Sequence, residues 1–95
     1  MEEGSRPERR EIYYSGWVQG VGFRYTARRL AARFPVAGFV KNLPDGRVQF
    51  VLEGAPAEID RLLAEIQDAM GNYIRGVQQT GGPATDEFQT FEIRF

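Results

Sequence analysis

One change of pattern decides the fold of this chain, and it falls within Ile12-Tyr13-Tyr14-Ser15-Gly16-Trp17-Val18-Gln19-Gly20-Val21-Gly22-Phe23-Arg24. The first part is rich in Tyr, Trp and Ile that alternate with a period of two, which predicts a strand over Glu11–Val18. Glycines then interrupt the strand and form a loop. From Phe23 to Phe34 the apolar residues recur at helical spacing, which predicts an amphipathic helix. A strand, a glycine loop and a helix N-terminus are therefore expected in direct succession.

The remainder of the chain continues this alternation of strands and helices. Pro35 ends the first helix because it has no amide hydrogen to donate. A Pro-Asp-Gly turn, with Gly46 in the left-handed position, joins two strands into a hairpin. The other predicted elements are a strand over Val36–Lys41, a strand over Val48–Leu52, a helix from Pro56 with Gly71 as its C-terminal cap, a weaker strand over Tyr73–Gln79, a loop at Gly81–Pro83 and a last strand over Phe91–Phe95.

The order of these elements is β-α-β-β-α-β with one additional strand, which predicts an α+β fold. Two helices bury their apolar stripes most economically on one face of a mostly antiparallel sheet, in the split βαβ arrangement. Residues 1–10 mix both signs of charge with Gly, Ser and Pro, and we expect them to form a flexible N-terminal tail. Residues 11–95 are then a single domain.

The composition excludes several kinds of chemistry. The chain has no cysteine and no histidine, so it has no disulfide, no thiolate nucleophile, no imidazole base and no Cys or His metal ligand. Its apolar runs are far shorter than the roughly 20 residues of a membrane helix, and it lacks an N-terminal signal region, so we expect a cytoplasmic protein. The net charge of −1 hides six cations between Ile12 and Phe50 against the single anion Asp45. This distribution favours a small anionic ligand over nucleic acid.

The loop and helix start at Val18–Arg24 have the properties of an anion-binding element. The first amides of a helix have no partner within it, and the helix dipole is positive at that end. Gly20 and Gly22 allow a phosphoryl group to approach the backbone closely, although two glycines would equally suit a short connection that binds nothing. Arg24 is unfavourable in a first helical turn unless an anion is bound, and its planar guanidinium can hold two phosphoryl oxygens. Dinucleotide and P-loop fingerprints are both incomplete here.

Two segments of the chain resemble the signatures of the acylphosphatase family. The first is Gly16-Trp17-Val18-Gln19-Gly20-Val21-Gly22-Phe23-Arg24, and the second is Gly38-Phe39-Val40-Lys41-Asn42 followed by Gly46-Arg47-Val48 and Gly54. The two segments occur in the order of the family, and the resemblance extends from Glu11 to Phe95. It implies a ferredoxin-like α/β sandwich that hydrolyses the carboxyl–phosphate bond of acyl phosphates without a metal, a cofactor or a phosphoenzyme.

The same resemblance implies roles for individual residues. Arg24 corresponds to the phosphate-binding arginine of the family, and Asn42 corresponds to its water-orienting asparagine. By position alone, Asn42 would be an ordinary turn former. We expect direct attack on phosphorus by a water that Asn42 holds, competitive inhibition by inorganic phosphate, a monomer, and no membrane or nucleic-acid partner. The phosphate-binding set is then Gln19, Gly20, Val21, Gly22, Phe23 and Arg24.

Three alternatives remain open from the sequence. An RNA-recognition-like module has the same topology, but its third strand needs several aromatics, and Phe50 alternates with Val48 and Leu52 as a core residue would. A non-catalytic anion-binding or protein-interaction domain would keep the anion-binding loop without turnover, although the presence of both Arg24 and Asn42 weighs against it. A module of the larger carbamoyl-transfer enzymes is the third alternative, and the end of the domain at Phe95 favours a free-standing enzyme. Nothing in the sequence forms an obvious pocket for the acyl group.

Overall fold

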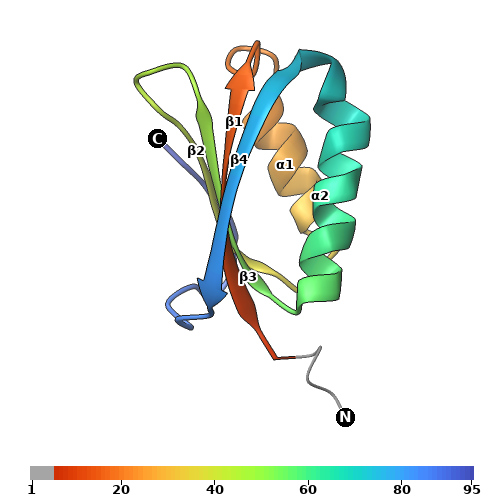
Figure 1. Cartoon of the computed structure of the whole chain (residues 1–95), viewed down its shortest axis with the longest axis vertical. Coiled ribbons are helices and arrows are strands. Elements are labelled where there is room, and N and C mark those ends of the chain that lie inside the picture. Colours follow the sequence, from red (N-terminus) through yellow and green to blue (C-terminus); the bar gives the residue numbers. More distant parts are fainter. Residues whose placement is uncertain (1–5) are drawn as a thin grey trace.

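The computed structural model describes residues 6–95 of the chain. One five-stranded sheet carries both helices on one face and leaves the other face open (Figure 1). This arrangement confirms the predicted α+β sandwich with one strand beyond the βαββαβ core. The elements are β1 (Glu8–Gly16), α1 (Phe23–Ala31), β2 (Ala37–Asn42), β3 (Val48–Gly54), α2 (Pro56–Met70), the 3-10 helix η2 (Gly71–Tyr73), β4 (Ile74–Pro83) and β5 (Phe91–Arg94).

The strand order of the sheet is β4-β1-β3-β2-β5. Each neighbouring pair is antiparallel except β2 and β5, which are parallel. Because β1 and β2 both pair antiparallel with β3, they run in the same direction, and β5 runs with them. The C-terminal ends of β1, β2 and β5 therefore lie at one end of the sheet.

The core lies between the helices and the sheet. Phe50 and Leu52 of β3 are fully buried there, as is Ile12 of β1. Tyr14 packs its ring against Phe23 with 5.2 Å between ring centroids, and burial raises the pKa of the Tyr14 hydroxyl. From the helices the core receives the predicted stripes, namely Phe23, Ala27, Leu30 and Ala31 of α1 and Ile59, Leu62, Ile66 and Met70 of α2.

The predicted end of the first helix needs correction. The α-helix α1 ends at Ala31, three residues before Phe34, because the amides of Arg33 and Phe34 donate to carbonyls only three residues back, in a tighter turn. Gly71 is the C-terminal cap of α2, as predicted, and has a right-handed φ of −57°. The chain continues from it into η2.

The fourth strand is longer than predicted. Gly81–Pro83, which the sequence predicted as a loop, pairs with the first residues of β1 and belongs to β4. Pro83 is tolerated because β4 is an edge strand, where one side of the backbone needs no ladder partner.

The predicted N-terminal tail is shorter than residues 1–10. β1 begins at Glu8, and Glu8–Arg10 pair with both β3 and β4. Arg10 has one partner that the local sequence does not reveal, since its Nη1 lies 2.6 Å from Asp60 Oδ1 of α2. Residues 1–5 of the predicted tail lie outside the described residues.

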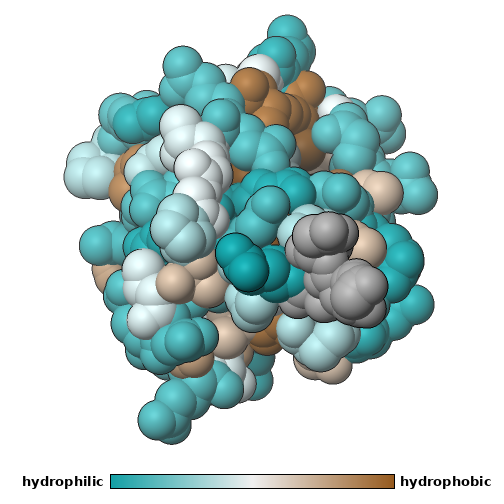
Figure 2. All heavy atoms as spheres, turned by 60° about the horizontal axis from the view of Figure 1, so that its bottom comes forward, coloured by the Kyte–Doolittle hydropathy of each residue, from teal (hydrophilic) through white to brown (hydrophobic). Residues whose placement is uncertain are grey.

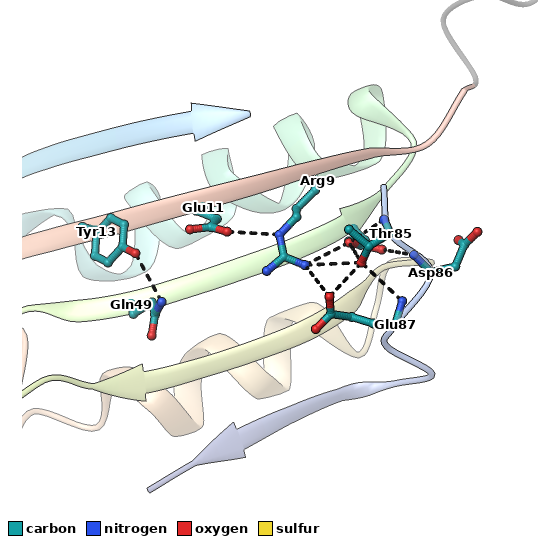
Figure 3. Close-up of polar contacts among 8 residues, drawn as sticks. Arg9, Glu11, Tyr13, Gln49, Thr85, Asp86 and Glu87 are labelled. Carbon is teal, nitrogen blue, oxygen red and sulfur yellow. Dashed lines mark hydrogen bonds and ion pairs between the residues drawn. The ribbon is translucent and has the colours of Figure 1, made fainter. Parts of the chain in front are cut away.

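A hydrogen-bonded cluster on the open face fastens the segment between β4 and β5 (Figure 3). The Glu53 carboxylate, only 6% exposed, accepts hydrogen bonds from the Thr85 amide at 2.9 Å, the Thr85 hydroxyl at 2.7 Å, the Asp86 amide at 2.9 Å and Arg9 Nη1 at 3.2 Å. Burial favours a higher pKa for Glu53, but these hydrogen bonds outweigh it and hold the pKa below its ordinary value. We call these four residues the Glu53 cluster.

The open face does not present the aromatic residue on which the RNA-recognition alternative depends. Phe50 points toward the helices, where it packs against Tyr14 and Phe91. The aromatic side chains that meet on the open face, Phe39 and Phe88, contact each other, and Arg94 covers the Phe39 ring.

The end of the molecule where the described chain begins is largely hydrophilic, with hydrophobic atoms only in small groups (Figure 2). A hollow of about 730 Å³ at this end is lined mainly by glycine and proline.

Within residues 6–95, neither helix has the length and apolar character needed to cross a bilayer.

Candidate active site

The loop of residues 17–22 and the turn of residues 43–47 lie at the same end of the sheet (Figure 1). The loop follows β1 and leads into α1, whereas the turn follows β2. Asn42 is the last residue of β2. The sheet topology therefore brings Asn42 beside the N-terminus of α1, although 20 residues of sequence separate it from Gly22.

The backbone of this loop is open to solvent space. Gly20 and Gly22 have left-handed conformations, with φ of 81° and 79°. A Cβ at either position would meet no other atom within 4 Å. Glycine is therefore required by the conformation rather than by crowding, and a ligand can reach the backbone directly.

The amides at the start of α1 lack partners among residues 6–95. Gly22 is the N-cap and offers no side chain, and the first turn contains no acidic residue. The amide of Thr26 donates to the Gly22 carbonyl at 3.0 Å and is the first in this segment with an acceptor. An uncapped helix N-terminus with free amides favours an anion. Between Trp17 and Thr26, the amides without an acceptor among residues 6–95 belong to Val18, Gln19, Gly20, Val21, Gly22, Phe23, Arg24 and Tyr25.

A pocket of about 270 Å³ joins the loop to the end of β2. It contains most of the site residues that the sequence predicted, including both proposed catalytic side chains. Its complete lining is Val18, Gly20, Gly22, Phe23, Arg24, Tyr25 and Asn42.

Asn42 lines this pocket and carries an unsatisfied acceptor. Its Oδ1 is buried and has no hydrogen-bond partner, which is true of no other buried side-chain N or O atom in the described part of the chain. Leaving such a group unpaired costs about 1–3 kcal/mol. A water or ligand in the pocket would recover this cost by donating a hydrogen bond to Oδ1.

Gln19 and Val21 do not line the pocket. The Gln19 side chain donates from Nε2 to the carbonyls of Leu43 at 2.8 Å and Arg47 at 2.9 Å. It therefore ties the loop to the turn that follows Asn42. Val21 packs against the hydrophobic core. Of these two residues, only the backbone amides remain candidates for a ligand.

The Arg24 guanidinium lies between the pocket and the end of β5. Its Nη1 donates to the Arg94 carbonyl at 3.5 Å, and its Cζ lies 4.7 Å from the centre of the Phe95 ring. No carboxylate among residues 6–95 forms an ion pair with it. Its positive charge is therefore not neutralised by a neighbouring side chain.

The one acidic residue of the Ile12–Phe50 segment is neutralised within its own turn. Asp45 accepts hydrogen bonds from the Arg47 amide at 3.1 Å and from Arg47 Nε at 2.8 Å. These contacts, the amide first, lower the pKa of Asp45. Asp45 is therefore paired with Arg47 and not with Arg24.

Two features of the site were missed from the sequence. Tyr25 lines the pocket, and its place directly after Arg24 in the first turn of α1 was the available signal. The Gln19 contacts with the turn had no signal, because they join residues 24 and 28 positions apart.

Within residues 6–95, no group of three His, Cys, Asp or Glu side chains is arranged to hold a metal ion.

The fold and the site define a ferredoxin-like α+β sandwich in which a free helix N-terminus and an asparagine share one small pocket. The sequence model of the acylphosphatase family matches residues 10–93. The chain belongs to the acylphosphatase family, which confirms the resemblance found in its two signature segments.

Individual relatives agree with this assignment. The acylphosphatase of Rubrobacter xylanophilus is 39% identical over 95 residues, covering 99% of this chain and 86% of that protein. The crystal structure of acylphosphatase from Bacillus subtilis has a TM-score of 0.83 at 28% identity, over 93% of this chain and 99% of that one. Full-length HypF, in a phosphate- and nucleotide-bound crystal structure, has a TM-score of 0.84 at 25% identity, but the match covers 100% of this chain and only 13% of HypF. The prediction of an enzyme of the acylphosphatase type is confirmed.

Proposed function

We propose that this protein hydrolyses acyl phosphates by direct attack of a water molecule that Asn42 holds beside the phosphorus. One observation carries the proposal. Asn42, whose buried Oδ1 has no hydrogen-bond partner among residues 6–95, lines the same pocket of about 270 Å³ as the loop whose amides lack acceptors. Donors for a phosphoryl group and an acceptor for water are thus available in a single small volume.

Arg24 and the loop amides of Gln19–Phe23 hold the phosphoryl oxygens. Backbone amides donate along fixed directions, and the guanidinium can donate two parallel hydrogen bonds while remaining charged at any physiological pH. These groups bind the phosphoryl group in the ground state and stabilise its charge in the transition state. Gln19 keeps the loop and the turn after Asn42 at a constant separation through its two hydrogen bonds.

The reaction itself needs little acid or base catalysis. The water oxygen attacks phosphorus opposite the acyl oxygen, the bond between phosphorus and that oxygen breaks, and its electron pair leaves with the carboxylate. One water proton is released as inorganic phosphate forms. Asn42 only accepts a hydrogen bond from the water and takes up no proton. Phosphoryl transfer passes through a loose transition state in which positioning and charge stabilisation dominate, so a chain without His or Cys can catalyse it.

The proposal includes several properties that follow from this chemistry. No metal or cofactor takes part, and a monomer is sufficient because one chain contributes every group. Inorganic phosphate competes with substrate because it occupies the same donors. We place this activity in the cytoplasm.

The test is hydrolysis of benzoyl phosphate by the wild type and by Asn42→Ala. We expect the wild type to be active and kcat of the variant to fall by about 100-fold or more, because a water in the wrong place loses much of the advantage of positioning. The inhibition constant for inorganic phosphate should change by less than about three-fold, since Asn42 contributes to the attack rather than to phosphate binding. A chelator should leave the wild-type rate unchanged.

Asn72→Ala is the matched control, because it makes the same substitution at an exposed residue of η2. It should retain the wild-type kcat. An equal loss of turnover and of phosphate affinity in Asn42→Ala would contradict the water-holding role, and an inactive wild type would contradict the proposed function.

A further inference from the structure

The wall of the pocket contains one exposed aromatic side chain, that of Tyr25, which is 60% exposed. The other apolar side chains of the wall, Val18 and Phe23, are buried in the core. Four other large hydrophobic side chains are exposed in the described part of the chain, and none of them lines this pocket. They are Trp17, Tyr73, Val77 and Phe95.

The side chains of Arg24 and Tyr25 leave α1 in different directions. Side chains of successive helical residues diverge by roughly 100° around the helix axis. Arg24 reaches toward β5, where it contacts the Arg94 carbonyl and the Phe95 ring. The Tyr25 side chain forms no hydrogen bond with residues 6–95, so its ring is not committed elsewhere.

The size of the pocket limits what it can enclose. Its volume of about 270 Å³ is below the range of about 300–1,000 Å³ that encloses drug-sized ligands. The acyl group of a substrate whose phosphoryl group lies at the loop amides must lie against the remaining wall of this pocket. There the exposed ring of Tyr25 offers it an apolar surface.

We infer that Tyr25 forms the acyl-group subsite and favours acyl phosphates with flat, apolar acyl groups over small ones. The inference rests on the proposed function, because it places the phosphoryl group at the loop. Tyr25 contacts a part of the substrate that does not react, so it contributes equally to ground-state and transition-state binding. Its removal raises KM for a flat substrate and leaves kcat unchanged.

The experiment compares KM for benzoyl phosphate and acetyl phosphate in the wild type, Tyr25→Ala and Tyr25→Phe. Contacts between aromatic rings predict that Tyr25→Ala raises KM for benzoyl phosphate by about three- to ten-fold, with less than about two-fold change for acetyl phosphate. Tyr25→Phe keeps the ring and should retain the wild-type ratio. Tyr73→Ala is the matched control, because Tyr73 is 39% exposed and does not line the pocket. It should also retain that ratio.

The inhibition constant for inorganic phosphate separates the acyl subsite from the phosphate site. It should be unchanged in Tyr25→Ala. Equal increases in both KM values, or a weakened phosphate inhibition of the same size, would overturn the inference while the activity of the wild type still supported the proposed function. A wild type that hydrolyses neither substrate would overturn both. If Tyr25→Ala does not fold, Tyr25→Leu keeps the bulk, removes the flat ring and is judged by the same criteria.

Discussion

The Glu53 cluster and the pocket around Asn42 use polar groups in opposite ways. The Glu53 carboxylate is nearly buried, and four donors satisfy it (Figure 3). Asn42 Oδ1 is also buried, yet it has no partner among residues 6–95, and the amides of the loop that lines the same pocket have no acceptor among them either. Buried polar groups are nearly always paired in folded proteins, so a cluster that leaves several unpaired invites a ligand. Polar groups whose hydrogen bonds are complete stabilise this fold, whereas polar groups without a partner lie at its candidate site.

Removing the charge of the site should have the largest effect. We expect Arg24→Ala to lower kcat/KM for benzoyl phosphate by about 1,000-fold or more, because one arginine often contributes that much to phosphoryl transfer. Inhibition by inorganic phosphate should disappear with it. Arg28→Ala is the control, since Arg28 lies one helical turn further on, is exposed and lines a separate hollow. Phosphate inhibition that survives in Arg24→Ala would show that other groups bind the phosphate.

A substitution that disrupts the hydrogen bonds of the Glu53 cluster should lower stability and leave catalysis unchanged. Glu53→Gln should lower the free energy of unfolding at pH 7 by about 1–3 kcal/mol, because its NH₂ group would face donors that now meet a carboxylate oxygen. The measurement is urea unfolding, with kcat determined at the same pH and expected to remain close to wild type. Glu65→Gln is the control, and it should change stability little because Glu65 pairs with exposed Arg33 at the surface.

The pH dependence of the stability loss in Glu53→Gln tests whether the loss comes from the Glu53 charge. The pKa of Glu53 is lower in the folded protein than the value of about 4.3 expected in the unfolded chain. Its stabilisation is therefore complete above that unfolded value and is lost as the pH falls through the lower folded pKa. The difference between wild type and Glu53→Gln should shrink accordingly in acid. A difference that is as large at pH 3 as at pH 7 would assign the effect to packing.

The smallest expected effect is on stability in Asn42→Ala. The substitution removes a buried acceptor that has no partner, so the free energy of unfolding should stay within about 1 kcal/mol of the wild type or rise. Urea unfolding of the same preparation used for kinetics makes the comparison direct. A loss of more than about 2 kcal/mol, in the range of a broken buried hydrogen bond, would place Asn42 with the structural groups.

Most of the fold was predictable because its signals are local. The alternation of Val48, Phe50 and Leu52 and the stripe of α2 both mark faces that are buried in the structure. The start of β1 and the end of β4 were not predictable. Glu8–Arg10 and Gly81–Pro83 pair with each other across more than 70 residues, and neither segment has an apolar pattern.

The candidate site divides in the same way. The glycine loop and Arg24 were recognisable from their place before a helix, and the left-handed φ of Gly20 and Gly22 agrees with that interpretation. Asn42 required the family resemblance, because an asparagine before a turn is ordinary on its own. Tyr25 was not singled out, since an aromatic in a helix is more often part of the core.

The sequence by itself determined the succession of elements, the glycine loop at a helix N-terminus, and the concentration of positive charge before Phe50. These properties depend on neighbours along the chain, where side-chain periodicity and backbone preference act. Only the tertiary structure decided which polar groups are satisfied. The partners come from distant segments, as when Gln19 donates to Leu43 and Arg47, Arg9 reaches Glu53, and Arg24 contacts Phe95. Whether a buried polar group has a hydrogen-bond partner depends on the groups that the fold brings next to it. At Asn42 the fold brings a pocket and no partner among residues 6–95.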